Sequence, residues 1–369
     1  MVDNKRLVSL DVFRGLTIAF MIIVNDPGNW SYVYAPLKHS PWNGCTLTDM
    51  VFPFFMFIMG AAMWYSYKKY NHELTGKLVL KILRRTFLIY LIGFLISWCS
   101  MWSFDLSNIR IMGVLPRIAV AYAIASFIVL CLRLNLVMVF TALILLGYWI
   151  ILLAFGGDYP FSLEGNFVRT FDIAILGLNH VPEFHGVRFD QTGLLSTLPS
   201  VANVLFGYLA GRLTDTSEIK LKAVKRLVLF GAAGVALALV WSLVFPINKP
   251  LWTSSFVIYT SGFASILLAL FLWLIDIKGY TGWSKPFLMF GMNAIFIYAL
   301  SQFMALAFRV RVALPGTGES VSLTNWIYST CFLPLAGKFN GSLLYALTFT
   351  FMLWVVSWIL YRKKIFIKL

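Results

Sequence analysis

The chain has 369 residues, of which 60% are hydrophobic, 17% aromatic and only 12% charged. A soluble globular domain carries about twice that fraction of charged residues, so the composition excludes an ordinary soluble protein and predicts a chain that lies in a lipid bilayer. The formal net charge of +15 comes from cations scattered between apolar runs, a pattern that indicates membrane topology and argues against a nucleic-acid partner.

Ten apolar runs have the length, about 17 to 25 residues, that a helix needs to cross the hydrocarbon core. They lack the alternation of a barrel, so the predicted fold is an all-α polytopic transmembrane bundle. The ten ranges are 7–24, 50–67, 87–102, 113–132, 136–155, 192–211, 227–245, 253–275, 287–308 and 342–361. The first is expected to be a retained helix, because no small-residue cleavage pattern follows it. The cysteines are too few and too widely spaced for a disulfide scaffold.

The distribution of cations predicts the orientation. Twenty lysines and arginines fall on the side that holds the N-terminus and eight on the other side, so both termini are predicted to be cytoplasmic. Residues 1–369 are then one transmembrane domain with two long outer loops, 25–49 and about 156–191, and loops of this length are often functional. The segment 323–335 is expected to be a short outer-face or re-entrant element, because prolines and glycines interrupt it.

The loop 25–49 holds the strongest candidates for chemistry. Asn25 closes the first predicted span, Asp49 opens the second, and His39 lies between them, so the three can meet at one membrane boundary. Two roles stay open for Asp49, stabilisation of a helix start or orientation of His39. His39 itself either bonds a backbone carbonyl or takes part in catalysis. No HxH or HExxH spacing occurs, so a metal site is not expected.

Charged side chains inside predicted spans are costly and indicate function or a partner. Asp11 and Arg14 lie three residues apart on the first span and can neutralise each other. Arg117 has no carboxylate within a turn of its helix, so it is expected to meet another helix or an anionic ligand. Asn203 and Asn293 are either interhelical hydrogen-bonding groups or ligand donors.

Eight short blocks spread over the chain resemble one family. Four precede residue 54: RLVSLDVFRG at 6–15, VN at 24–25, KHSPWNG at 38–44 and DMVFP at 49–53. Four follow: RIMGVLPR at 110–117, GLLST at 193–197, NKPLWT at 248–253 and GMNA at 291–294. The residues of these blocks and their order along the chain are similar to those of the heparan-α-glucosaminide N-acetyltransferase family and its bacterial transmembrane relatives.

The resemblance implies an enzyme that moves acetyl from acetyl-CoA to the amine of a glucosamine-type sugar, or of a glycan terminus, across the membrane. It implies that His39 is catalytic, with Asn25 and Asp49 as its neighbours, and that the protein forms a homodimer in a bacterial inner (cytoplasmic) membrane. Histidine titrates near neutrality and suits a general base, or it can carry acetyl as an acyl-imidazole. Asp49 is then expected to orient the ring and Asn25 to donate to the oxyanion.

The chain has no Gly-rich phosphate loop, so scattered cations are expected to hold the CoA. We expect Arg14, Lys285 and Asn293 near the mouth of a cytoplasmic cavity and Arg117 deeper. The residues expected to bind the acceptor are Asp26, Lys38, Asp190, Asn248, Lys249 and Trp252. Two other functions stay open: a transporter of amino sugars or anionic solutes, and an O-acetyltransferase of envelope glycans.

Overall fold

The computed structural model describes residues 7–101, 105–217, 219–313 and 320–367. This part of the chain is mostly helical. Its α-helices are α1 (Val8–Asn25), α2 (Leu47–Tyr67), α3 (Gly76–Ser100), α4 (Val114–Cys131), α5 (Leu134–Phe155), α6 (Phe167–Leu176), α7 (Thr197–Thr216), α8 (Lys220–Trp241), α9 (Ser254–Phe271), α10 (Lys285–Met292), α11 (Ala294–Ala307), α12 (Leu323–Ile327) and α13 (Leu333–Arg362). Two antiparallel hairpins pair β1 (Glu183–Phe184) with β2 (Val187–Arg188) and β3 (Arg311–Ala313) with β4 (Ser320–Ser322).

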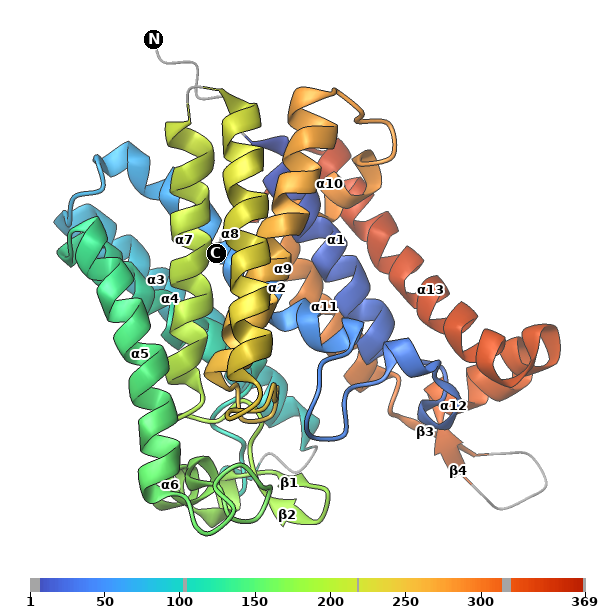
Figure 1. Ribbon diagram of the computed structural model, residues 1–369. Coiled ribbons are helices and arrows are strands. Elements are labelled where there is room, and N and C mark those ends of the chain that lie inside the picture. Colours follow the sequence, from blue (N-terminus) through green and yellow to red (C-terminus); the bar gives the residue numbers. More distant parts are fainter. Residues whose placement is uncertain (1–6, 102–104, 218, 314–319, 368–369) are drawn as a thin grey trace.

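The long helices form one bundle with all the short outer elements at one end. In Figure 1, α6, α12 and both hairpins lie at the lower end, and the chain enters α1 at the upper end. The most apolar stretch of α2 is 72% buried and that of α8 only 22%. Leu229 and Phe230 on α8 are strongly exposed, as are Leu143 and Ile150 on α5. These apolar outer surfaces are what a lipid environment requires.

Glycines let two helix pairs approach closely at the centre. A Cβ at Gly60 of α2 would overlap the carbonyl of Val204 on α7, and a Cβ at Gly207 of α7 would overlap the carbonyl of Phe57. Gly15 of α1 faces the backbone of α10 in the same way. Backbone contact of this kind replaces the hydrophobic driving force that helices lack in lipid.

Within the described ranges, seven helices are long and apolar enough to cross a membrane, and the pair α10–α11 makes up to eight. Each of the ten predicted ranges overlaps one long helix or, for 287–308, the helix pair. The two further members, α3 and α7, have 25 and 20 residues but are not among the seven. The structure therefore supports a polytopic helical membrane protein, and the count of ten stays a prediction.

Several predicted elements differ from the structure in their bounds or course, including the ranges 87–102, 287–308 and 323–335. The range 87–102 is part of α3, which starts eleven residues earlier, where the Thr75 side chain caps the Leu78 N–H at 3.3 Å. The range 287–308 is bent by 84° at Asn293, whose backbone is not helical. The segment 323–335 is helical and leads into α13, with a break at Gly337, where φ is +74°. Leu323–Arg362 counts as one candidate span.

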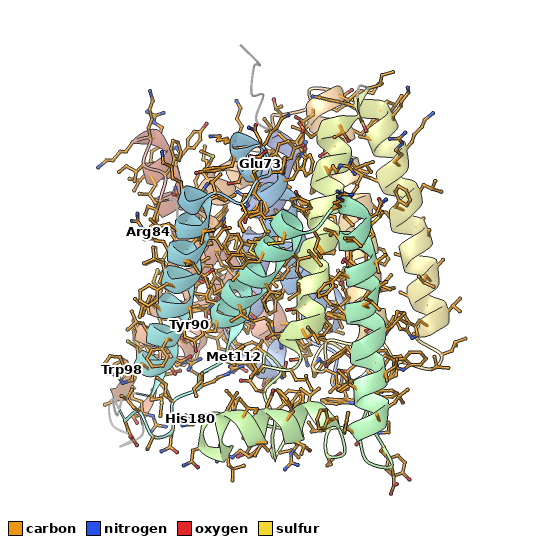
Figure 2. All side chains as sticks on the ribbon, turned by 90° about the vertical axis from the view of Figure 1, so that its left-hand side faces the viewer. Glu73, Arg84, Tyr90, Trp98, Met112 and His180 are labelled. Carbon is orange, nitrogen blue, oxygen red and sulfur yellow. The ribbon has the colours of Figure 1, made fainter. Side chains whose placement is uncertain are left out.

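The second outer loop is ordered by its own short elements. Figure 2 shows α6 lying across the ends of the long helices, with His180 beside it and Glu73 at the opposite end of the bundle. Asn166 caps α6 through the Arg169 N–H, 2.9 Å away. The β1–β2 hairpin follows, and it carries side chains to the site described next.

Candidate active site

Asp49 lies in the first turn of α2 and uses its two carboxylate oxygens for two different contacts. Oδ2 accepts the backbone N–H groups of Thr46 and Ser40, both at 3.0 Å, which fixes the helix start and the loop before it. Oδ1 lies 2.7 Å from Nδ1 of His39. The two roles that the sequence left open for Asp49 are therefore both present in the geometry of one side chain.

Lys249, in the connection between α8 and α9, completes a cluster of three groups. Its Nζ lies 3.0 Å from His39 Nδ1 and 3.3 Å from Asp49 Oδ1. Burial lowers the pKa of Lys249, and the neighbouring Asp49 opposes that shift. The side chain of His39 is 43% exposed, whereas that of Asp49 is 1% exposed. A buried ion pair thus holds an accessible imidazole.

The contacts to Nδ1 indicate the tautomer of His39. A carboxylate only accepts hydrogen bonds and an ammonium only donates them. With a proton on Nδ1 directed to Asp49 at the shorter distance, Lys249 pairs with the same carboxylate. In a neutral ring of this tautomer, Nε2 of His39 has a free lone pair, as a base or nucleophile needs.

The two loops that carry His39 and Lys249 are joined directly. Gly44 donates its N–H to the Ile247 carbonyl at 2.7 Å. The Asn248 side chain donates to Oδ1 of Asn43 at 3.1 Å and accepts the Leu251 N–H at 2.7 Å. Asn248 is fully buried, so the structure gives it the role of fixing the loops and does not place it on the cavity surface.

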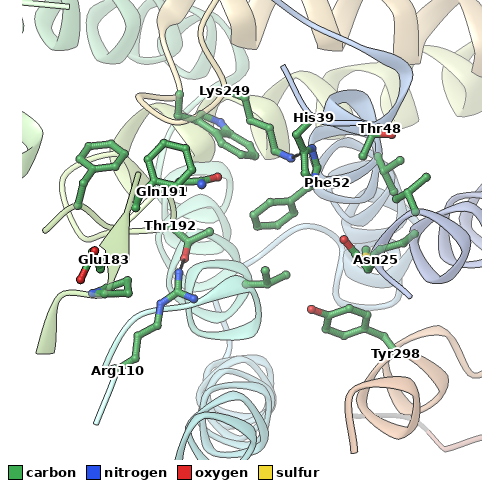
Figure 3. Close-up of a pocket in the computed structure, with 18 residues that line it drawn as sticks. Asn25, His39, Thr48, Phe52, Arg110, Glu183, Gln191, Thr192, Lys249 and Tyr298 are labelled. Carbon is green, nitrogen blue, oxygen red and sulfur yellow. Dashed lines mark hydrogen bonds between the residues drawn. The ribbon is translucent and has the colours of Figure 1, made fainter. Parts of the chain in front are cut away.

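A cavity of about 300 Å³ opens beside this cluster, and we call it the outer cavity because it lies at the end of the bundle that carries the two long loops. Figure 3 shows His39 and Lys249 directed toward one another on one wall, with Arg110 and Thr192 opposite and Asn25 beside Tyr298. Its lining consists of Met21, Val24, Asn25, His39, Thr48, Val51, Phe52, Arg110, Val114, Pro182, Glu183, Phe184, Phe189, Gln191, Thr192, Lys249, Trp252 and Tyr298. Three of the predicted residues that line it, Asn25, His39 and Lys249, offer polar groups to one space.

Asp190 supports the opposite wall from behind. Its carboxylate accepts hydrogen bonds from Nη2 and Nε of Arg110 at 2.6 and 3.0 Å, and Nη2 also donates to Thr192 Oγ1 at 2.6 Å. Burial by itself would raise the pKa of Asp190, but Arg110 outweighs burial and holds it below its usual value. A two-pronged pair of this kind fixes the guanidinium plane. Arg110, Gln191 and Thr192 therefore face the cavity, and Asp190 does not.

Trp252 forms part of the cavity wall and is held from its far side. Its indole N–H donates to Asn203 Oδ1 at 2.9 Å. The Arg117 guanidinium lies over its ring, 4.8 Å from the centroid. Arg117 is fully buried and also donates to the Gly193 carbonyl and to Ser196. The structure thus places Arg117 behind the outer cavity, and Asn203 acts between α7 and α9.

Two other predicted acceptor residues lie outside this cavity lining. Lys38 is exposed, and its carbonyl accepts the Thr46 hydroxyl at 2.7 Å. Asp26 lines a neighbouring cavity that shares Asn25 with the first. The remaining histidines do not line this cavity: His72 contacts Tyr208, His180 contacts the Ile109 carbonyl, and His185 lies against the ring of Phe184.

A third cavity, of about 260 Å³, lies toward the other end of α1 and α2. Three cations line it, Arg14 on α1 and Lys81 and Arg85 on α3. Arg14 contacts Asp11 at 3.2 Å and the Gly291 carbonyl at 3.4 Å. Arg85 covers the ring of Tyr122, 4.7 Å from its centroid. Such a cationic cavity fits the phosphates of an anionic ligand.

Asn293 and Lys285 stand beside this cavity and do not line it. Asn293 donates to the Ile365 carbonyl at 3.1 Å and accepts the Ile367 N–H at 2.8 Å. It therefore fixes the segment after α13 against the bend between α10 and α11, and Ile367 lines the cavity. Lys285 begins α10, six residues before the lining residue Gly291.

The third cavity, which we call the inner cavity, approaches the outer cavity within the bundle. On α2, Phe52 lines the outer cavity and Phe55 the inner one; on α11, Tyr298 lines the outer and Ile295 the inner. Three helical residues correspond to about 4.5 Å along the axis. Less than one turn of helix therefore separates the two linings at both places.

The sequence interpretation missed several lining residues. Lys81 and Arg85 have the spacing of one helix turn, but the prediction placed them in a loop. Arg110 belongs to the block at 110–117 that resembles the family, but the sequence interpretation gave it no role. Glu183 and Gln191 lie in the loop of about 156–191, and the sequence did not predict how that loop folds. Across the described residues, three or more His, Cys, Asp or Glu side chains do not gather closely enough to hold a metal ion.

The fold and this site define a class: integral helical membrane proteins with a His–Asp pair in one cavity and a cationic cavity toward the opposite end of the bundle. Residues 6–230 match the family model described as heparan-alpha-glucosaminide N-acetyltransferase, catalytic. The chain belongs to that family. It is 29% identical to the human heparan-alpha-glucosaminide N-acetyltransferase over 99% of this chain and 60% of that protein. It is 31% identical to the mouse heparan-alpha-glucosaminide N-acetyltransferase over 80% of this chain and 53% of that protein. The chain therefore spans only part of the length of these relatives.

Proposed function

We propose that this protein is a transmembrane N-acetyltransferase that moves acetyl from cytoplasmic acetyl-CoA to the amine of a glucosamine-type sugar at the outer face. One observation carries the proposal: the His39–Asp49 pair faces a cavity that nearly meets a cationic cavity from the opposite end of the bundle. An acceptor and an anionic donor on opposite sides of a membrane need such an arrangement. The family of the chain supports the same chemistry.

In the direct route, His39 acts as the general base. The sugar ammonium gives a proton to Nε2, its nitrogen attacks the thioester carbon, and the amide of Asn25 donates to the oxygen that becomes negative. The C–S bond then breaks, and the leaving CoA thiolate takes the second proton that the nitrogen loses. Asp49 keeps the ring in the tautomer with a free Nε2.

In the second route, Nε2 of His39 attacks the thioester first. The C–S bond breaks, CoA leaves as a thiolate, and acetyl stays on Nε2 as an acetyl-imidazole. The unprotonated amine then attacks the acetyl carbon, the C–Nε2 bond breaks, and the freed ring takes the proton that the new amide nitrogen loses. An acetyl group trapped on His39 in the absence of acceptor supports this route. Kinetics that require both substrates before any CoA is released exclude it.

For the donor, Arg14, Lys81 and Arg85 are the proposed partners of the CoA phosphates, because they line the cationic cavity. This assignment needs that cavity to face the cytoplasm. The proposed topology has ten spans, made of the seven candidates, the pair α10–α11, α3 and α7, with both termini cytoplasmic. We further propose a bacterial inner membrane as the location and a homodimer as the assembly.

The test is an acetyl-transfer assay on the purified full-length protein with acetyl-CoA and glucosamine. We expect CoA release by the wild type and by His185→Ala, whose histidine is exposed on the same face, and a loss of roughly 100- to 10,000-fold in His39→Ala. Equal release by wild type and His39→Ala contradicts the catalytic assignment. If the wild type releases no CoA in the presence of glucosamine but carries the amino sugar into liposomes, the result favours a transporter. A product acetylated on oxygen favours the O-acetyltransferase.

A further inference from the structure

A second cavity opens at the outer face next to the first. Its volume is about 370 Å³. It is lined by Asn25, Asp26, Pro27, Gly28, Asn29, Trp30, Ala305, Arg309, Ser322, Thr324, Asn325, Tyr345 and Phe349. Asn25 also lines the His39 cavity, so the two spaces adjoin at a side chain that we assign to the reaction. A ligand that extends beyond the reacting group has this space to enter.

Hydrogen bonds to distant elements fix the walls of the second cavity. Gly28 donates its N–H to the Ser342 carbonyl at 3.2 Å, and the Ser342 hydroxyl bonds both the N–H and the carbonyl of Asn29. On the other side, the Thr324 N–H bonds the Phe308 carbonyl at 3.1 Å. The cavity is therefore held between α1, α11, α12 and α13 before any ligand arrives.

Asp26 gives the cavity an unmet acceptor. Its Oδ2 is buried and accepts no hydrogen bond from any residue within the described ranges. Buried polar atoms without a partner are rare in folded proteins and indicate a missing donor. Burial raises the pKa of Asp26 to about 7, although the nearby Arg309 opposes the shift. A ligand hydroxyl directed at Oδ2 would supply the donor.

The other lining groups favour a neutral sugar. The amides of Asn29 and Asn325 both donate and accept, as do the hydroxyls of Ser322 and Thr324, which matches the hydroxyls of a pyranose. The charged side chains of this lining, Arg309 and Asp26, oppose each other, because Arg309 favours the ionised form of the Asp26 carboxyl group against its burial. Trp30 is 63% exposed at the cavity and offers a ring face to the C–H groups of a sugar.

We propose that this second cavity binds the sugar residue next to the amino sugar that is acetylated, so that the preferred acceptor is at least a disaccharide. The inference rests on the proposed function, because it needs an amino sugar at His39. In this proposal the neighbouring sugar contacts Asp26, Asn29, Trp30 and Asn325. The glycosidic linkage between the two sugars lies beside Asn25.

The experiment compares two acceptors on the purified full-length protein. One is glucosamine, and the other is a disaccharide in which glucosamine with a free amine is linked to glucose. We expect kcat/KM for the disaccharide to be larger by roughly tenfold or more, the effect of one or two good hydrogen bonds. In Trp30→Ala and in Asn325→Ala this ratio should fall toward one. Both side chains are exposed, so these changes spare the folded core.

Matched controls are Tyr159→Ala and Asn108→Ala, which remove an exposed aromatic ring and an exposed amide from outer segments that line neither cavity. They should keep the ratio of the wild type. A wild-type ratio near one, with glucosamine acetylated, overturns the second sugar site and leaves the proposed function intact. A ratio that Trp30→Ala and Asn325→Ala both leave unchanged also overturns it. No CoA release from either acceptor contradicts the proposed function and this inference with it.

Discussion

The outer and inner cavities of this bundle are built in different ways. Most polar groups of the outer cavity come from loops: His39 from the α1–α2 connection, Lys249 from the α8–α9 connection, and Arg110 and Gln191 from the segments before α4 and α7. The inner cavity is lined by α1, α2, α3, α10 and α11, and by Ile367 beyond α13. Loops gather chemically different groups at one point, whereas helices present repeated groups along one face.

The two cavities also differ in how their charged side chains are paired. In the outer cavity the cations have carboxylate partners, Lys249 with Asp49 and Arg110 with Asp190. The inner cavity has three cations, of which Arg14 contacts Asp11. Paired charges orient a reacting group without attracting counterions, and an excess of cations attracts phosphate. This difference supports the proposal that transfer takes place in the outer cavity and that the donor binds in the inner one.

The largest expected effect is that of Asp49→Asn on the outer cavity. The amide cannot both hold the Nδ1 proton of His39 and balance Lys249, so the wrong tautomer and orientation become accessible. We expect kcat to fall by roughly 100- to 10,000-fold while KM for acetyl-CoA changes little. The measurement is steady-state CoA release at saturating donor.

Asp49 also caps α2, so its variant needs a structural control. Thermal unfolding in detergent reports whether the fold persists, and Asp105→Asn removes an exposed carboxylate from the α3–α4 connection. Activity within about twofold of the wild type in a folded Asp49→Asn protein would show that the His39–Asp49 contact is structural.

Arg14→Gln tests the inner cavity alone. Loss of one cation from the proposed phosphate site should raise KM for acetyl-CoA by roughly tenfold, about the effect of one charge-assisted hydrogen bond, with a smaller change in kcat. The matched control is Arg84→Gln, an exposed cation on the same end of α3 that does not line the cavity (Figure 2). An unchanged KM for acetyl-CoA would remove Arg14 from the donor site.

Lys249→Met separates the ion pair from the His39–Asp49 contact. The methionine keeps the length of the side chain but loses the Nζ that lies 3.0 Å from His39. We expect kcat/KM to fall by roughly tenfold, the worth of one hydrogen bond to a charged group of about 1.5 kcal/mol. A loss as large as that of Asp49→Asn would instead make Lys249 an equal partner in the transfer step.

The smallest effect concerns the stability of the outer wall. Asp172 on α6 accepts the N–H groups of Leu194 and Leu195, and burial raises its pKa from 3.8 to about 7. The folded state therefore binds a proton that the unfolded state releases, and the free energy of unfolding falls as pH rises from about 4 to about 7. Asp172→Asn should reduce the difference in Tm between pH 5 and pH 8.

The matched control for that measurement is Asp158→Asn, which changes an exposed carboxylate of the same outer loop. It should keep the pH dependence of the wild type. A wild-type Tm that rises over this pH range would contradict the assignment, because a carboxylate with a raised pKa in the folded state stabilises the fold only at low pH.

The helices could be predicted far better than the site. Apolar runs identified every long helix, because a chain in lipid must satisfy its backbone hydrogen bonds within continuous helices. The start of α3 was missed, because its first turns carry basic residues that resemble a loop. The bend at Asn293 was also missed, because it depends on contacts with Ile365 and Ile367, more than seventy residues away in the chain.

The sequence by itself determined the helical membrane class, the family and the candidates His39, Asn25 and Asp49, since these follow from composition, run length and short motifs. Only the tertiary structure decided that Lys249 contacts His39, that Asp190 holds Arg110 rather than a ligand, and that Arg117 lies behind Trp252. The physical reason is distance along the chain. Periodicity and capping are local properties, but side-chain contacts across 80 to 210 residues depend on how the helices pack.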